Sequence, residues 1–313
     1  MAKSKRKEPK GRWGRKLKDN RDWTKYSEEL VVRGEFLLES NWVGSWDNEL
    51  AAMNKGKRGK PFAFPESLIS LQGVWHQWID YRGVEGITRK MAEHGIVPIH
   101  NDFSTINRRV NKLDIAFALP RSGNVSVACD GTGMKFENGG EHRARLYGKK
   151  KRRHIRVIIT ANPFTKELLD CDVSVDGEGL SEPDFAEESM RHMQAEGLQV
   201  TKFWGDGGFD DKDLFGFLEA NCIEPAIPTQ KNAVLSGNDT LRDKEVMARK
   251  KLGYKKWAKK RKYGQRWTGT EGIFSAVKRK FGENTRAHDA ENVCHEAKMK
   301  LWAYEAMKAY ATT

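Results

Sequence analysis

Three acidic residues, Asp130, Asp206 and Glu271, stand far apart in the chain but in comparable local settings. Asp130 follows the apolar run VSVAC, Asp206 follows VTKFWG, and Glu271 opens a segment with the apolar spacing of a helix. Carboxylate oxygens are the ligands that hard divalent cations prefer. Two such cations held close together can support in-line displacement at a phosphodiester bond. We therefore expect these three side chains to converge on one metal site that acts on a nucleic-acid backbone.

The two aspartates share a strand before them and glycines after them. Residues 125–130 favour a strand that ends at Asp130, before the stretch GTG, and Asp206 precedes two glycines. A strand supplies rigid support, and glycines let a nucleic-acid backbone come close. A turn-forming role is the alternative for either aspartate alone. The DGTG stretch does not indicate an aspartic protease, because the second Asp-Thr/Ser-Gly that those enzymes need is absent.

Glu271 begins a predicted amphipathic helix. The buried stripe of this helix would consist of Ile273, Phe274, Val277 and Phe281. Glu271 and Lys278, seven residues apart, would then lie on one flank of it, where a carboxylate can face a metal ion and an ammonium a phosphate. The alternative is local, because Thr268-x-x-Glu271 is also the pattern of a capping box.

The periodicity predicts an α/β catalytic domain over residues 119–313. Strands are expected at 125–130, 154–160, 167–174, 200–205 and 223–227, and helices at 183–195 and 212–221 separate the last three. This βββαβα order is the layout of a ribonuclease-H-like core, a mixed sheet flanked by helices. An amphipathic pair at 271–281 and 291–310 closes the chain.

The chain before residue 119 is predicted to be helical after a basic arm. Residues 1–21 should be disordered when free, and residues 22–118 should form a small all-α domain. Apolar residues recur at helical spacing three times between 66 and 113, which fits a helix-turn-helix domain. Its third helix would present polar side chains suited to base edges, namely Thr105, Asn107, Arg108, Asn111 and Lys112. A structural bundle with an ordinary polar face is the alternative. In the preceding link, Arg58 and Lys60 have the types and spacing that fit a minor groove.

Charge points to a polyanionic partner. The chain has 56 Lys and Arg against 43 Asp and Glu, a formal net charge of +13. One basic run, 142–156, contains Lys150 and Arg152, and another, 249–266, adds Trp257, so both favour contact with phosphates and bases. A solvated charged face is the usual alternative for such a run. No apolar run approaches 18 residues and the N-terminus lacks an apolar stretch, so we expect a cytoplasmic, nucleoid-associated protein without a membrane partner.

The C-terminal residues resemble a known family of enzymes. Tyr263, Arg266, Glu271 and Lys278 match in type the Y-x2-R-x3-E-x6-K signature of one group of DDE transposases from prokaryotic insertion sequences. In this chain four residues separate Arg266 from Glu271, where the signature has three. The stretches CDGTG and WGDGGFD at the two aspartates are similar to the same group, so the resemblance spans nearly the whole chain.

The resemblance implies a DNA transposase. Asp130, Asp206 and Glu271 would hold two Mg²⁺ (or Mn²⁺) ions, and Tyr263, Arg266 and Lys278 would hold the DNA backbone near the scissile bond. Double-stranded DNA, both element ends with their terminal inverted repeats and target, would be the partner of a homodimer or higher synaptic complex. Two alternatives stay open: a metal-dependent nuclease or resolvase of the same fold without strand transfer, and a DNA-binding regulator derived from a transposase.

Overall fold

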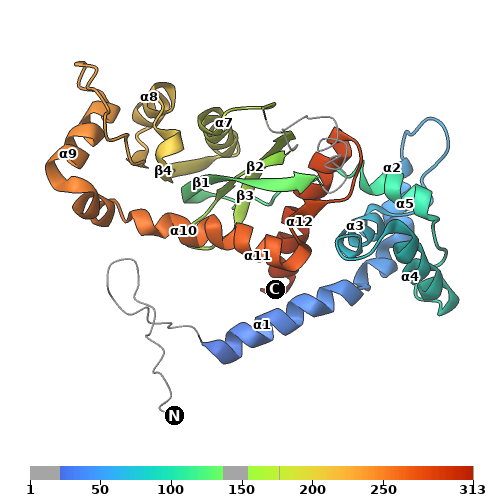
Figure 1. Ribbon diagram of the computed structural model, residues 1–313. Helices are drawn as coiled ribbons and strands as arrows, with labels where there is room; N and C mark the ends of the chain where they lie inside the picture. Colours follow the sequence, from blue (N-terminus) through green and yellow to red (C-terminus); the bar gives the residue numbers. More distant parts are fainter. Residues whose placement is uncertain (1–21, 137–153, 176, 313) are drawn as a thin grey trace, which may run out of the picture. The chain divides into compact units, whose positions relative to one another are not determined.

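Figure 1 shows a computed structural model of the chain, which describes residues 22–136, 154–175 and 177–312. The predicted basic arm, and the basic run with Lys150 and Arg152, lie outside the described residues. The chain divides into two compact units, of which the second is Ser40–Ala306. The boundary that the sequence predicts near residue 118 therefore does not separate two compact units, because both sides of it belong to the second.

The first unit combines described residues 22–39 with 307–312. Its main element is α1 (Trp23–Glu35), followed by the 3-10 turn η1 (Phe36–Leu38). Asp22 caps α1, because its side chain accepts hydrogen bonds from the backbone amides of Thr24 and Lys25. The rings of Phe36 and Tyr310 meet edge to face, with centroids 5.5 Å apart, which joins the two segments of this unit.

The second unit starts with helices. They are η2 (Asn41–Ser45), α2 (Trp46–Asn54), α3 (Glu66–Trp75), α4 (Tyr81–Glu93) and α5 (Phe103–Val110). The last three lie where the sequence predicts three helices. Their core includes Leu68, Val84 and Ile106, none of which is exposed to solvent. A buried amide, Gln72, donates to Thr88 and Asn101 and so links these helices through polar contacts that burial strengthens.

A six-stranded mixed sheet follows in the same unit. Its strands are β1 (Gly123–Phe136), β2 (His154–Ala161), β3 (Leu168–Val175), β4 (Leu198–Trp204), β5 (Glu224–Ala226) and β6 (Asn284–Thr285). The spatial order is β3-β2-β1-β4-β5, and β6 pairs with β1. The first three strands form an antiparallel meander, whereas β4, β5 and β6 join in parallel. The predicted order of strands and helices is confirmed.

Helices cover both faces of the sheet (Figure 1). In chain order they are α7 (Glu182–Ala195), η3 (Gly207–Phe209), α8 (Lys212–Ala220), α9 (Leu241–Lys260), η4 (Tyr263–Gln265), α10 (Arg266–Gly269), α11 (Glu271–Phe281) and α12 (Ala290–Tyr310). Successive side chains of β1 point to opposite faces of the sheet, so neighbouring residues pack against different helices. Val127 and Cys129 pack in the cluster formed with α7 and α8, whereas Ala128 packs with Trp257 and Tyr263 on the other side.

The helical segment and the sheet are joined inside the second unit by specific contacts. The indole N–H of Trp78 donates to the carbonyl of Lys280 at 3.2 Å, and its ring packs on Phe281. The guanidinium of Arg286 donates to the carbonyls of His76 and Gln77 at 3.0 and 2.9 Å. Arg286 thereby satisfies carbonyls at the C-terminal end of α3. Among the described helices, none is both long and apolar enough to cross a membrane.

Candidate active site

Strands β1 and β4 bring Asp130 and Asp206 to one edge of the sheet. The two strands pair in parallel as far as Ala128 and Trp204, and each aspartate follows two residues later. The two carboxylates are close enough for Asp206 to raise the pKa of Asp130. One expectation is wrong: β1 does not end at Asp130 but continues to Phe136, because its second half is paired with β2.

Arg266 connects Asp130 with Glu271. Its guanidinium Nη1 lies 3.0 Å from Asp130 Oδ2, and Nη2 lies 3.5 Å from Glu271 Oε1. Arg266 is the first residue of α10 and Glu271 the first residue of α11. Thr270, between the two helices, donates its hydroxyl to Asp130 Oδ2 at 3.2 Å. The break between α10 and α11 thus accommodates the extra residue of the motif, while Arg266 stays at the carboxylates.

The capping-box alternative for Glu271 is not observed. The N-cap of α11 is Thr270, which makes no side-chain capping bond. The hydroxyl of Thr268 donates to the carbonyls of Pro163 and Gln265 at 3.0 and 2.8 Å. The Glu271 side chain is 55% exposed and pairs with Arg266, so its position serves the carboxylate cluster and not the start of its own helix.

The electrostatics of Asp130 call for a cation. Burial raises the pKa of its carboxyl; the Arg266 guanidinium opposes this effect, and Asp206 adds to it. Within the described residues, no three Asp, Glu, His or Cys side chains lie close enough together in this conformation to hold a metal ion. The Arg266 guanidinium is a positive group held between two of the carboxylates. The carboxylates offer oxygen donors only, and such donors suit Mg²⁺ or Mn²⁺.

A fourth carboxylate, Glu182, reaches the same place and was missed from the sequence. It is the first residue of α7. Burial and the charges of Asp206 and Asp130 raise the pKa of its carboxyl, and Arg156 opposes them. Nothing in its local sequence distinguishes it, because an acidic residue in the first turn of a helix normally serves the helix dipole. The order of elements is the signal that could have found it, since α7 starts next to the end of the sheet where the aspartates lie.

Comparison with known families agrees with this geometry. A family described as "Transposase DDE domain" matches residues 121–305, and a second family with the same description matches residues 31–139. The chain belongs to the DDE transposase family. Among curated proteins, no match was found. One similar solved structure is the Drosophila P element transposase strand transfer complex, with 13% identity, a TM-score of 0.31 and coverage of 85% of this chain and 70% of that chain.

Transposase DDE domains generally use divalent metal ions. Tyr263 is one of the residues that the resemblance predicts to hold the DNA backbone. Tyr263 is buried against Trp257, and burial raises its pKa to about 12. The guanidinium carbon of Arg266 lies 5.5 Å from the centre of the Tyr263 ring. The Tyr263 ring therefore packs against the Arg266 guanidinium and helps to hold it in position. The structure gives Tyr263 no exposed face of the kind that the predicted backbone contact requires.

Trp257 of the transposase is placed differently from the prediction. It was expected to stack on DNA bases, but only 1% of it is exposed. Its indole N–H donates to the buried carboxylate of Glu245 at 2.9 Å, and Arg261 binds the same carboxylate. Trp257 therefore anchors the end of α9 to the sheet, whereas the lysines around it are exposed.

Lys278 lies on α11 with its side chain directed at β1. Its ammonium donates to Thr132 Oγ1 at 2.9 Å and to the carbonyl of Gly133 at 2.8 Å. These residues follow Asp130 by two and three positions. The Lys278 ammonium therefore binds β1 just after Asp130, and its role toward a DNA backbone stays a prediction.

The residues predicted to read DNA differ in exposure. Arg58, Lys60, Arg108 and Lys112 are exposed. Thr105 is partly buried, and its hydroxyl donates to Asp102, the N-cap of α5. These placements leave the four cations free to approach a phosphate backbone, whereas Thr105 has a local structural role.

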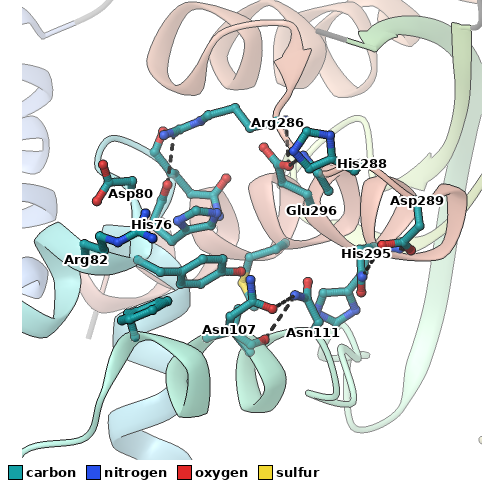
Figure 2. Close-up of a pocket in the computed structure, with 17 residues that line it drawn as sticks. His76, Asp80, Arg82, Asn107, Asn111, Arg286, His288, Asp289, His295 and Glu296 are labelled. Atoms are coloured by element: carbon teal, nitrogen blue, oxygen red, sulfur yellow. Dashed lines mark hydrogen bonds between the residues drawn. The ribbon is translucent and has the colours of Figure 1, made fainter. Parts of the chain in front are cut away.

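Asn107 and Asn111 line a pocket of about 470 Å³ beside α5 (Figure 2). The Asn111 amide donates to both the carbonyl and the side-chain oxygen of Asn107, at 3.0 Å each. Tyr81, which stacks on His76 at 3.7 Å between ring centroids, and Arg286 also line this pocket. The two asparagines are thus engaged with each other and with the pocket in this conformation.

Proposed function

We propose that the protein is a DNA transposase that binds the terminal inverted repeats of its element, cleaves at the ends and joins the 3′ ends to target DNA. Its core would be of the ribonuclease-H-like type, which the meander β1–β3 followed by α7, β4, α8 and β5 supports. The observation that carries the proposal is the meeting of Asp130 and Glu271 on one guanidinium, beside Asp206. Asp130 and Glu271 are 141 positions apart in the chain, so only the tertiary fold brings them together.

Asp130, Asp206 and Glu271 would hold two divalent cations. When bound, such ions activate water or a 3′-hydroxyl and stabilise the leaving oxygen of an in-line displacement. Thr270 holds Asp130 in place through a hydrogen bond, and the Gly208 amide donates to Asp206 at 2.7 Å. Both aspartates are therefore oriented before any substrate arrives, which is the support that such a site needs.

Arg266 has a double role in this proposal. In the metal-free protein it neutralises Asp130 and Glu271. Cations at these carboxylates compete with its ion pairs, so the guanidinium becomes available for a phosphate of the DNA, for which its planar fork is well suited. Lys278, whose ammonium lies at Thr132 two residues after Asp130, supplies a second positive charge for the backbone.

DNA would approach over exposed cations outside the carboxylate cluster. Arg108 and Lys112 on and beside α5, with Arg58 and Lys60 in the link, supply positive charge in the helical segment. Lys255 and Lys256 do so on α9. Neutralisation of phosphates by such side chains provides most of the sequence-independent affinity. A homodimer or larger synaptic complex would bring the two ends of an element together.

The test is a strand-cleavage and strand-transfer assay with labelled DNA carrying the inverted repeats that flank the gene. We expect Asp130→Asn, Asp206→Asn and Glu271→Gln to bind DNA as the wild type does, and to lose cleavage and joining by roughly 10³-fold or more. Asp213→Asn, an exposed aspartate on α8, is the matched control. Cleavage without joining would indicate a nuclease, and full activity in any triad variant would remove that residue from the site.

A further inference from the structure

Glu182 occupies space that two glycines leave open at the carboxylate cluster. A Cβ atom at Gly131 would collide with Glu182 Oε1, and a Cβ atom at Gly208 would lie 3.2 Å from Oε2 and 3.0 Å from Asp206 Oδ1. Gly131 follows Asp130 directly, and Gly208 is two residues after Asp206. The carboxylate of Glu182 is therefore inserted beside both aspartates, in a position that only residues without a side chain permit.

This carboxylate has no direct hydrogen-bond or ion-pair partner among the described residues. Among the described residues, neither oxygen of Glu182 makes a hydrogen bond or an ion pair, although the side chain is partly buried. Two charges of its own sign, Asp206 and Asp130, act on it, and one opposite charge, Arg156, partly offsets them without an ion pair. Arg266, which neutralises Asp130 and Glu271, forms no ion pair with it. A partly buried anion beside two others is unfavourable unless a further cation joins them.

We propose that Glu182 is a fourth ligand of the divalent cations, shared with Asp130 and Asp206. This inference rests on the proposed function and deepens it, because it names a residue outside the three of the family signature. Glu182 comes from the first turn of α7, whereas the other two come from β1 and β4. The ligands would therefore come from the sheet and from α7, and a cation bound between them would link α7 to the sheet.

A purely local role makes a different prediction. As an acidic residue at the N-terminus of α7, Glu182 would stabilise the helix dipole, and its neutralisation would then destabilise the protein with or without metal. If like-charge repulsion dominates, Glu182→Gln should raise the melting temperature in EDTA and reduce the further rise that Mn²⁺ produces. The two explanations therefore differ in the sign of one measurement.

The experiment measures Mn²⁺ binding to the full chain by titration calorimetry, together with melting temperatures in EDTA and in Mn²⁺. We expect Glu182→Gln to weaken Mn²⁺ binding by at least tenfold and to melt higher in EDTA than the wild type. Glu188→Gln, an exposed glutamate on the same helix, should change neither. Asp130→Asn should weaken Mn²⁺ binding as well, and this variant tests the metal site itself.

The outcomes separate the two proposals. Wild-type Mn²⁺ affinity in Glu182→Gln, with a loss in Asp130→Asn, would overturn the role of Glu182 and leave the transposase site intact. Unchanged affinity in both variants would overturn the site as well. If Glu182→Gln does not fold, Gly131→Ala displaces the same flexible carboxylate, and Gly133→Ala, whose Cβ would meet nothing within 4 Å, is its control. Equal Mn²⁺ affinity in these two alanine variants would also overturn the inference.

Discussion

The Arg266 guanidinium lies 3.0 Å from the Asp130 carboxylate, and both side chains are mostly buried, 9% and 14% exposed. This ion pair joins α10 to β1 at the candidate metal site. Removal of the Arg266 side chain would leave Asp130 buried beside Asp206 without the cation that offsets their repulsion. A buried pair that loses one partner is strongly destabilised, because the remaining charge is neither solvated nor compensated.

Arg266→Ala should therefore lower the free energy of unfolding in EDTA by about 3 kcal/mol. Saturating Mg²⁺ should recover more stability in this variant than in the wild type, because the ion no longer competes with a guanidinium for Asp130. Urea unfolding with and without Mg²⁺ measures both effects. Arg89→Ala removes an exposed i,i+4 pair with Glu85 and should change stability by about 1 kcal/mol or less. An equal response to Mg²⁺ in Arg266→Ala and wild type would contradict the competition.

Gly269, at the end of α10, sets the position of Arg266 through a close backbone contact. A Cβ atom there would lie 2.8 Å from Pro163 Cα, which belongs to the backbone and cannot swing aside. Gly269→Ala should therefore push α10 away from the loop after β2, at a cost of about 1–3 kcal/mol. DNA cleavage should fall as well, because Arg266 and Glu271 flank this glycine.

The control for this substitution is Gly272→Ala in the first turn of α11. A Cβ atom there would make an ordinary contact, 3.6 Å from the carbonyl oxygen of Trp267. Alanine is the better helix former, so this variant should be as stable as the wild type or more stable by up to about 1 kcal/mol. Thermal unfolding and the cleavage assay would decide, and a Gly269→Ala protein that matches Gly272→Ala in both would refute the proposed packing.

The sequence predicts the two aspartates and the strands that carry them, but it does not predict the fourth carboxylate, Glu182. Asp130 and Asp206 stand out because apolar runs precede them, and the parallel pairing of β1 and β4 then fixes them at one edge. Glu182 could not be chosen in this way, because nothing local distinguishes it from an acidic residue in the first turn of any helix. Its role depends on where α7 starts relative to β1, which is a tertiary property.

The exposure of Trp257 was predicted wrongly from its neighbours in the sequence. Six Lys and Arg residues between positions 255 and 262 surround it in the sequence, so an exposed ring for base stacking was predicted. The structure buries the ring, because helical periodicity turns it toward Ala128 and Trp204 while the lysines face outward. Its polar N–H is satisfied by Glu245, an acidic residue twelve positions earlier. A basic stretch therefore does not by itself indicate that its aromatic residues are exposed.

The exposed cations near α5 give a direct test of DNA binding by the helical segment. Arg108→Ala and Lys112→Ala should each weaken binding to inverted-repeat DNA and to unrelated DNA alike. Each should also reduce the slope of log affinity against log salt concentration by about 1, if the side chain neutralises one phosphate. Fluorescence anisotropy between about 50 and 200 mM salt measures this slope. Lys90→Ala, on the exposed face of α4 in a pair with Glu93, is the control, and an unchanged slope in all three variants would exclude α5 from the DNA surface.

His76 should make stability fall in mild acid. Burial, followed by the nearby Arg286, lowers its pKa from 6.5 to about 4, while the charge of Asp80 opposes and that of Lys300 adds to the effect. The folded state therefore binds a proton less readily than the unfolded state does. The stability from the neutral ring is fully present above pH 6.5 and is lost as the pH falls from 6.5 to about 4, by about 3 kcal/mol in total.

Replacement of this histidine should flatten the pH dependence. His76→Gln keeps a side-chain N–H for the carbonyl of Ile79, which His76 Nδ1 contacts at 3.0 Å, but it loses the stacking on Tyr81. The variant should thus be less stable than the wild type at pH 7.5 and should lose less stability on acidification to pH 4.5. Urea unfolding at a series of pH values measures this, with His100→Gln, an exposed histidine, as the control. Parallel curves for His76→Gln and wild type would show that the ring titrates alike in the folded and unfolded states, because only a pKa difference between them couples His76 to stability.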